Sequence, residues 1–231
     1  MLVIGIEGLV GAGKTTICRN LINKMPNSIL LNGGNLYRTV VTAIMQKGKN
    51  IEDLVKNAKS LDIKKMMDLL KVEIKIENKE TFFYIDGKKA DEELIQSKEI
   101  SMAVSSLGGR ADEKNLYSFA KELIDNLKEK YNVIISGRDL MKIYPDCDYH
   151  IFITADLDER VKRKAMQYDN KNMEEIKENI VKRDKLQEEA GYYDLSDITK
   201  VVDVTDCKTA EESTNKVLNF INLKKLTSTA V

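Results

Sequence analysis

A glycine-rich loop near the amino end of the chain constrains its fold more than any other feature. Residues 8–16 read GLVGAGKTT. The pattern G-x-x-x-x-G-K-[ST] is matched there by Gly8, Gly13, Lys14 and Thr15. The apolar run of residues 2–6 predicts a strand buried on both faces, and residues 14–24 predict a helix that ends before Pro26. A strand before the loop and a helix after it are the context that a phosphate-binding loop requires.

Each residue type in this loop has a chemical role in holding phosphate. Glycines let the backbone curl, so that its N–H groups and the amino end of the helix point at the phosphates of a nucleoside triphosphate. Lys14 adds a mobile positive charge, and the Thr15 hydroxyl can bind Mg²⁺. We therefore expect Mg²⁺ as the cofactor and an ATP site formed by Gly8, Gly11, Ala12, Gly13, Lys14, Thr15 and Thr16.

Strands and helices alternate along the rest of the chain, which predicts a three-layer α/β fold with a central parallel sheet. Further strands of this sheet are expected at residues 28–31, 132–135, 149–153 and 201–204. Residues 72–76 and 81–85 break the alternation as an antiparallel hairpin, so residues 33–110 are expected to form an insertion. Residues 156–189 are charged and strongly helical, which is typical of a mobile lid.

Other helices are expected from the spacing of apolar residues. They should cover residues 36–45, 51–59, 63–70, 92–96, 100–107, 112–129 and 210–221. The tail at residues 224–231 should be frayed. We expect residues 1–231 to form one domain that contains both the insertion and the lid.

Charge and cysteine content argue against several classes of protein. The 231 residues carry 37 Lys plus Arg and 37 Asp plus Glu, so no global field favours nucleic acid or an anionic membrane. The three cysteines lack the spacing of metal or redox sites, and no run approaches the length of a membrane span or a signal peptide. We expect a cytoplasmic monomer that binds small molecules and neither nucleic acid nor membrane.

A phosphate-binding loop is shared by kinases, GTPases, motor ATPases and nucleotide sensors. Residues 170–173 are the nearest string to the base-reading motif N-K-x-D of GTPases, and they lack its Asp. Motor ATPases need an acidic pair after a core strand, whereas the strand at residues 132–135 is followed by Ser136 and Gly137. The sequence therefore favours a kinase.

Four stretches, in the same order along the chain, resemble the family of bacterial cytidylate kinases. They are the loop at 8–16, LYR at 36–38, IDGKKADEELIQSKEISMAVSSL at 85–107, and GRD at 137–139 with the later string PDCDYHIFITADLDERVKRK. The resemblance covers almost the whole chain. It implies a P-loop fold with an inserted subdomain for a nucleoside monophosphate and a helical lid. It also implies transfer of the γ-phosphoryl group of ATP to a nucleoside monophosphate, with CMP or dCMP preferred.

The resemblance further implies two sets of functional residues. Acceptor binding would involve Arg38, Ser105, Lys114, Arg138 and Asp139. Catalysis would involve Lys14, Arg138, Arg160, Arg163 and Arg183, because the arginines would neutralise the phosphoryl group in flight. No general base is required, since the acceptor is already a phosphate anion.

Several positions depart from the family pattern. Asn32 and Gly33 stand where the family has an acid and a hydroxyl, and Ser136 stands where it has an acid. Gln187 and Ala190 stand where it has a sugar-binding Asp and a further Arg. Two alternatives therefore stay open: a P-loop kinase of another small metabolite, and a nucleotide-binding regulatory protein with little turnover.

Structural roles also fit some of the same residues. Arg38 has the alternative of an ordinary surface arginine, and Arg160 and Arg163 that of a solvated helix face. Glu7, at the end of the first strand, has two interpretations: it organises Mg²⁺ through water, or it serves the fold alone. His150 is the single histidine and has no ligand partners nearby in the sequence, which indicates a structural role.

Overall fold

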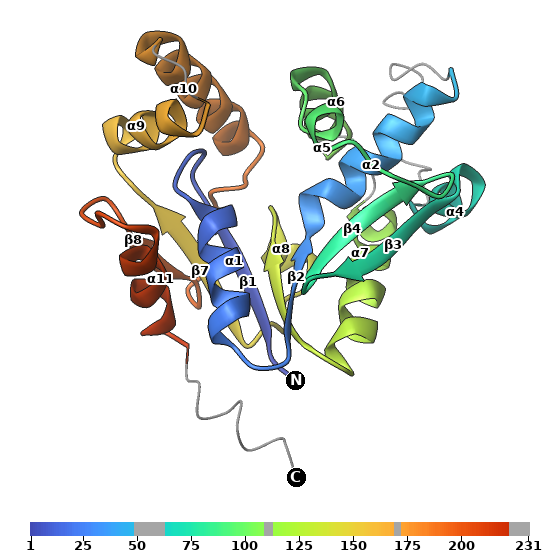
Figure 1. Ribbon diagram of the computed structural model, residues 1–231, viewed down its shortest axis with the longest axis horizontal. Helices are drawn as coiled ribbons and strands as arrows, with labels where there is room; N and C mark the ends of the chain where they lie inside the picture. Colours follow the sequence, from blue (N-terminus) through green and yellow to red (C-terminus); the bar gives the residue numbers. More distant parts are fainter. Residues whose placement is uncertain (49–62, 109–112, 169–171, 222–231) are drawn as a thin grey trace. The chain divides into compact units, whose positions relative to one another are not determined.

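A computed structural model describes residues 1–48, 63–108, 113–168 and 172–221 (Figure 1). The expected helix at 51–59 and the expected frayed tail at 224–231 lie outside the described residues. The chain forms two compact units, residues 1–30 with 130–231, and residues 31–129. Within the described ranges, no helix combines the length and the apolar character needed to cross a membrane.

The first unit is built on a parallel sheet with the strand order β2-β6-β1-β7-β8. Its strands are β1 (Val3–Gly8), β2 (Ser28–Asn32, which begins in this unit), β6 (Asn132–Ser136), β7 (Tyr149–Thr154) and β8 (Lys200–Asp203). β1 pairs in parallel with β6 and with β7, and β7 pairs in parallel with β8. The carboxyl ends of β1, β6 and β7 therefore meet at one edge of the sheet, where α/β proteins bind ligands.

Helices pack on both faces of this sheet. α1 (Lys14–Lys24) and α11 (Ala210–Leu218) lie side by side (Figure 1), and their apolar residues share one core with Ile4 and Ile6 of β1. Because side chains alternate along a strand, Gly5 faces the other way, where Leu140 of the short helix α8 (Leu140–Ile143) covers it. Ile4 and Ile6 are completely buried, and each contributes about 1.5–3 kcal/mol of transfer free energy. The predicted α/β fold with a parallel sheet is confirmed.

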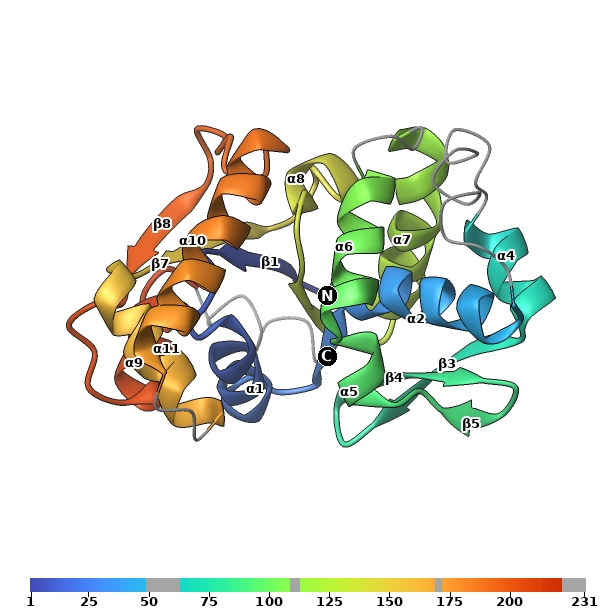
Figure 2. The same ribbon diagram turned by 90° about the horizontal axis from the view of Figure 1, so that it is seen from above.

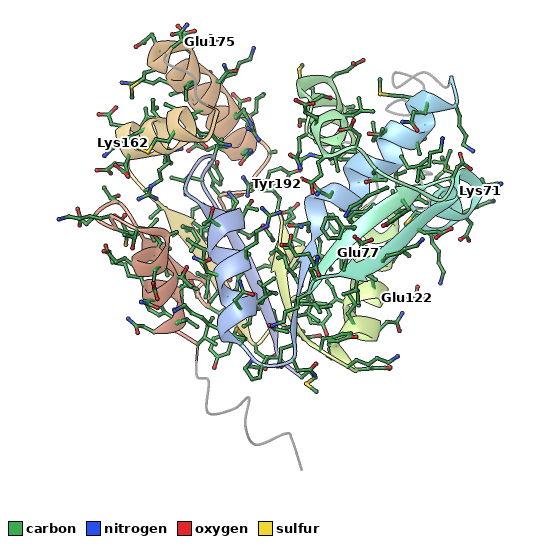
Figure 3. All side chains as sticks on the ribbon, viewed as in Figure 1. Lys71, Glu77, Glu122, Lys162, Glu175 and Tyr192 are labelled. Carbon is green, nitrogen blue, oxygen red and sulfur yellow. The ribbon has the colours of Figure 1, made fainter. Side chains whose placement is uncertain are left out.

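Two helices fill the segment where the sequence predicts a lid. α9 (Leu157–Tyr168) and α10 (Met173–Glu189) pack against each other (Figure 2), and the Asn172 side chain caps α10 by accepting from the Glu175 N–H at 3.2 Å. Figure 3 shows the charged side chains of Lys162 and Glu175 on the exposed sides of this pair. Its small apolar core includes Val10 of the glycine-rich loop together with Val161, Ile176 and Ile180. The role of this pair as a mobile lid stays a prediction.

The second unit holds a hairpin and the helices around α2. Its elements are α2 (Gly33–Gln46), α4 (Ile63–Leu70), β3 (Val72–Glu77), β4 (Glu80–Ile85), β5 (Lys88–Lys89), α5 (Glu92–Ile95), α6 (Lys98–Gly108) and α7 (Glu113–Lys128). β3 and β4 pair antiparallel across Asn78 and Lys79, both of which have positive φ, as a tight two-residue turn requires. The predicted hairpin is confirmed. α2 packs against α4, α5, α6 and β4.

Candidate active site

The glycine-rich loop joins β1 to α1 at the carboxyl edge of the parallel sheet, and two of its glycines are needed for different reasons. Gly8 has φ +146°, and a Cβ there would lie 2.1 Å from the carbonyl oxygen of Ile153 on β7. Gly13 has φ +94°, but a Cβ there would meet nothing within 4 Å. Gly8 thus allows the loop to pass close to β7, whereas Gly13 provides the left-handed backbone at the start of α1.

The amino end of α1 is suited to an anion. Its N-cap residue, Gly13, offers no side-chain cap, and its first turn contains no acidic residue. The Ile17 N–H makes the first helical bond, to the Gly13 carbonyl at 3.0 Å, so the preceding N–H groups have no partner within the helix. Thr15 and Thr16 are exposed in this first turn. These N–H groups and the helix dipole favour a phosphate group at this end.

Lys14 turns its ammonium group toward the loop. Lys14 Nζ donates to the carbonyls of Gly8 and Leu9 at 2.8 and 2.9 Å. Burial of this group, and then the nearby charge of Arg138, hold the pKa of Lys14 well below its ordinary value, and the Arg183 charge acts in the same direction. The positive charges of Lys14, Arg138 and Arg183 therefore form a cationic cluster, which Asp184 opposes in part and a bound anion would stabilise.

Arg138 follows β6 and is held by two acceptors. Its Nε donates to Gln187 Oε1 at 2.9 Å, and its Nη1 donates to the Gly137 carbonyl at 3.1 Å. Burial lowers the pKa of Arg138 from its ordinary value. Asp139 comes next with φ +56°, and its Oδ1 lies 3.5 Å from Lys142 Nζ.

Arg160 and Arg163 lie one turn apart on α9, and both donate to backbone carbonyls of the loop. Arg160 is buried; it donates to the Val10 carbonyl at 3.1 Å and pairs with Asp184. Arg163 Nη2 donates to the Val204 carbonyl at 2.7 Å, and its Nη1 lies 3.4 Å from the Ala12 carbonyl. In this structure the two arginines attach α9 to the loop. Their catalytic role stays a prediction, as does that of Arg183, which is exposed on α10.

Asp184 and Tyr193 are two site residues that sequence reasoning missed. Asp184 Oδ1 accepts from the Val10 N–H at 3.2 Å and from the Tyr193 hydroxyl at 2.7 Å. That hydroxyl also lies 3.0 Å from Gln187 Oε1, the oxygen that accepts from Arg138. Proximity to Arg183 in the sequence was a signal for Asp184. Nothing in the sequence marks Tyr193, which follows Tyr192 (labelled in Figure 3) beyond the end of α10.

Glu7 and His150 form a buried polar pair directly before the loop. Glu7 Oε1 accepts from the Leu140 N–H at 3.0 Å, and its Oε2 lies 2.8 Å from His150 Nε2. The other ring nitrogen of His150 lies 2.8 Å from Thr199 Oγ1. Both carboxylate oxygens of Glu7 are therefore engaged, which supports its structural interpretation over the binding of Mg²⁺ through water.

The residues expected to bind the acceptor fall in both units. Arg138 and Asp139 belong to the first. Arg38 belongs to the second, on α2, where its Nη1 lies 3.4 Å from Asn35 Oδ1. Gln96 Nε2 donates to that same oxygen at 2.8 Å. Ser105 lies on α6 and Lys114 on α7, but their side chains are outside the described part of the structure. The acceptor role of all five stays a prediction.

A magnesium ion fits the donor set of this site. No cluster of three or more His, Cys, Asp or Glu side chains that could hold a metal occurs among the described residues. Mg²⁺ that is bound with a nucleotide takes most of its ligands from phosphates and water, with one or two from protein oxygens. The exposed Thr15 hydroxyl, beside the open end of α1, suits that requirement.

The parallel sheet, the loop between β1 and α1, and the loop lysine define a P-loop nucleotide-binding protein. A family model described as cytidylate kinase matches residues 4–223. The chain belongs to the cytidylate kinase family, as the sequence motifs predicted. Membership supports nucleotide kinase activity.

Several known proteins align with nearly the whole chain. The cytidylate kinase of Clostridioides difficile is 29% identical over 231 residues, which cover 96% of this chain and 99% of that protein. The cytidylate kinase of Bacillus cereus is 25% identical over 228 residues, which cover 95% of each chain. Shikimate kinase from Bacteroides thetaiotaomicron aligns at 14% identity with a TM-score of 0.46, over 95% of this chain and 98% of that chain. Thymidylate kinase from Candida albicans aligns at 16% identity with a TM-score of 0.40, over 97% of this chain and 92% of that chain.

Proposed function

We propose that this chain transfers the γ-phosphoryl group of ATP to the phosphate of a nucleoside monophosphate, with CMP and dCMP as preferred acceptors. The observation that carries the proposal is the cationic cluster at the open end of α1, where Lys14 lies near Arg138 and Arg183. A triphosphate would relieve the repulsion within this cluster. The preference for cytidine nucleotides is supported by the family and by the names of the relatives.

The chemistry needs positioning and charge neutralisation more than proton transfer, because the attacking group is already an anion. The N–H groups at the start of α1 would hold the β- and γ-phosphates, and Lys14 would turn from the Gly8 and Leu9 carbonyls toward them. Arg138 would neutralise the transferred group as charge moves from ATP to the acceptor. Mg²⁺, held by Thr15 and the phosphates, would supply further neutralisation.

The test is a coupled assay of ADP formation with ATP, Mg²⁺ and each nucleoside monophosphate in turn. We expect the highest kcat/KM for CMP and dCMP, and we expect EDTA to abolish turnover. If no monophosphate at millimolar concentration raised ADP formation above the background hydrolysis of ATP, the proposal would be rejected. Selective turnover of another phosphorylated or hydroxylated metabolite would instead favour a P-loop kinase of that compound.

A matched set of arginine variants separates a kinase from a nucleotide sensor. Arg38→Ala and Arg138→Ala should each lose turnover while keeping the affinity for ATP, because Arg38 is assigned to the acceptor and Arg138 to the acceptor and to the group in transfer. Arg19→Ala is the control, since Arg19 is an exposed arginine on α1 outside the site. A regulatory protein would show little turnover even before substitution.

A substitution at Gln187 tests how the sugar of the acceptor is recognised, because CMP and dCMP differ only in the sugar. Gln187 stands where the resemblance implies a sugar-binding Asp, and its side-chain oxygen already accepts from Arg138 and lies within hydrogen-bond distance of Tyr193. A neutral amide oxygen accepts a weaker hydrogen bond from a sugar hydroxyl than a carboxylate does. We therefore expect Gln187→Asp to change kcat/KM differently for the ribose and the deoxyribose substrate.

A further inference from the structure

A chain of hydrogen bonds connects Arg138 to the glycine-rich loop. Arg138 Nε donates to Gln187 Oε1 at 2.9 Å, and the Tyr193 hydroxyl lies 3.0 Å from that oxygen. The same hydroxyl lies 2.7 Å from Asp184 Oδ1, which accepts from the Val10 N–H at 3.2 Å. The Tyr193 hydroxyl is therefore the point where the contacts to Arg138 and the contacts to the loop meet.

The donors and acceptors in this series of hydrogen bonds allow one arrangement. An arginine Nε–H can only donate, so Gln187 must turn its oxygen, not its NH₂ group, toward Arg138 and Tyr193. Tyr193 must then be the donor to both Gln187 and Asp184. Burial, and then the hydrogen bond to Asp184, raise the pKa of Tyr193, so the hydroxyl keeps its proton at neutral pH. One proton thus lies between two oxygens and holds both side chains in place.

The ring of Tyr193 is fixed to the sheet rather than to α10. It packs edge-to-face on Phe152 of β7, with ring centroids 5.6 Å apart and an interplanar angle of 81°. This is a favourable geometry for two aromatic rings. Because β7 also carries Ile153, whose carbonyl accepts from the Leu9 N–H at 3.0 Å, the same strand supports both Tyr193 and the loop.

We propose that Tyr193 is a positioning residue for phosphoryl transfer. Tyr193 holds Arg138 through Gln187 and contacts the phosphate-binding loop through Asp184, so that Arg138 keeps a fixed place relative to this loop. The inference rests on the proposed function, because Arg138 is assigned there to the transferred group. Displacement of a catalytic group by about 1 Å can lower a rate about 100-fold. Loss of the hydroxyl should therefore lower turnover more than stability.

The first experiment compares steady-state kinetics of Tyr193→Phe with the wild-type protein. The variant keeps the ring on Phe152 and loses the donor. We expect kcat with CMP to fall about 10- to 100-fold, while KM for ATP and the midpoint of thermal unfolding stay close to wild type. The control is Tyr131→Phe, which removes a hydroxyl just before β6, at the opposite end of that strand from Arg138. An unchanged kcat in Tyr193→Phe would overturn the proposal.

A double-mutant cycle with Gln187→Ala tests the route of the effect. Tyr193 reaches Arg138 through Gln187, so its hydroxyl should matter little once that side chain is gone. We expect Tyr193→Phe combined with Gln187→Ala to have nearly the kcat of Gln187→Ala alone. Losses that multiply would show that Tyr193 acts independently of Gln187, and the proposal would be wrong.

A third measurement does not depend on turnover. The Arg138 Nε–H proton, assigned in NMR spectra by its loss in Arg138→Lys, should exchange faster with water in Tyr193→Phe than in wild type. Unchanged exchange would overturn the link between Tyr193 and Arg138 even in an active enzyme. If the wild-type protein phosphorylated no nucleotide, the proposed function would fail, and this measurement would still decide whether the link exists.

Discussion

At the residue scale, the glycines of the phosphate-binding loop differ in what they tolerate. Gly8→Ala would place a Cβ 2.1 Å from the Ile153 carbonyl oxygen, at φ +146°. Because that neighbour is backbone, strand β7 or the loop must move. We expect a loss of about 2–4 kcal/mol in the free energy of unfolding, from overpacking and backbone strain together. Urea unfolding, monitored by circular dichroism, measures it.

Gly13→Ala and Gly48→Ala are the matched controls. Both positions have positive φ, +94° and +70°, and a Cβ at either meets nothing within 4 Å. Each should lose only about 1–2 kcal/mol, the cost of a left-handed backbone for alanine. Gly13→Ala should also weaken nucleotide binding, because its methyl group would enter the space at the start of α1, whereas Gly48→Ala should not. Equal destabilisation in all three variants would contradict the close approach at Gly8.

Lys14 predicts a coupling between nucleotide binding and proton uptake. Its pKa is held well below the ordinary value of 10.5, first by burial and then by Arg138, and a bound phosphate should raise it again. Between these two pKa values Lys14 is neutral in the free protein and charged in the complex. We therefore expect binding of a non-hydrolysable ATP analogue in this pH window to take up a proton. Calorimetry in two buffers of different ionisation enthalpy measures the uptake.

The lowered pKa of Lys14 also determines whether the free energy of unfolding rises or falls with pH. The unfolded chain binds more protons than the folded one in this window, so the stability of the ligand-free protein should rise with pH across it. Lys24→Met, on the last turn of the same helix, is the control and should keep the proton uptake. If no proton were taken up at any pH from neutrality to about 10.5, the pKa of Lys14 would not be lowered in the free protein.

At the scale of secondary-structure elements, Glu7 joins β1, β7 and α8 through its two oxygens. Glu7→Ala leaves the Leu140 N–H and His150 without this partner, so we expect a loss of about 2–4 kcal/mol in the free energy of unfolding. Glu7→Gln should lose less than half as much. Its amide oxygen can accept from Leu140, and His150 can accept from its NH₂ group by changing tautomer toward Thr199. Chemical denaturation compares the two variants.

Glu211→Ala is the control for this pair. Glu211 Oε1 lies 3.0 Å from Lys24 Nζ, but 70% of its side chain is exposed, so the loss should stay below about 1 kcal/mol. Equal losses for Glu7→Ala and Glu7→Gln would mean that the charge of Glu7 matters, not its two hydrogen bonds.

The same scale shows what sequence patterns could predict. The bounds of α1 follow from its sequence, because Gly13 starts the helix and Pro26 lies just beyond its end. The hairpin is predicted from the alternation of apolar and polar residues, which is clear in β3 (VEIKIE), and β4 buries every second side chain. The four residues of α8 were missed because one turn is too short to show a period. β5, with two residues, has no pattern of its own and exists only through its pairing with β4.

At the scale of the whole molecule, the site could be predicted only as far as local motifs reach. The loop, Lys14 and Arg138 lie in motifs that have a chemical meaning on their own. Asp184 accepts from the Val10 N–H across 174 positions, and Gln187 accepts from Arg138 across 49. Tyr193 joins these contacts by its hydroxyl, while its ring packs on Phe152 of β7. Such contacts are set by the tertiary fold, so a sequence that places Asp184 beside Arg183 still does not show which groups Asp184 contacts.

The division into two units predicts which helices each substrate should protect against hydrogen exchange. The loop, α1, α9 and α10 belong to the first unit, whereas α2 with Arg38 belongs to the second. A non-hydrolysable ATP analogue at 100 times its dissociation constant should stabilise the protein by about 2.7 kcal/mol. Its protection against hydrogen exchange should concentrate in the first unit, and CMP alone should protect α2. Mass spectrometry of exchanged peptides, with GMP as the control nucleotide, measures both patterns. Protection of α2 by the ATP analogue as strong as that of α1 would show that α2 does not respond specifically to the acceptor.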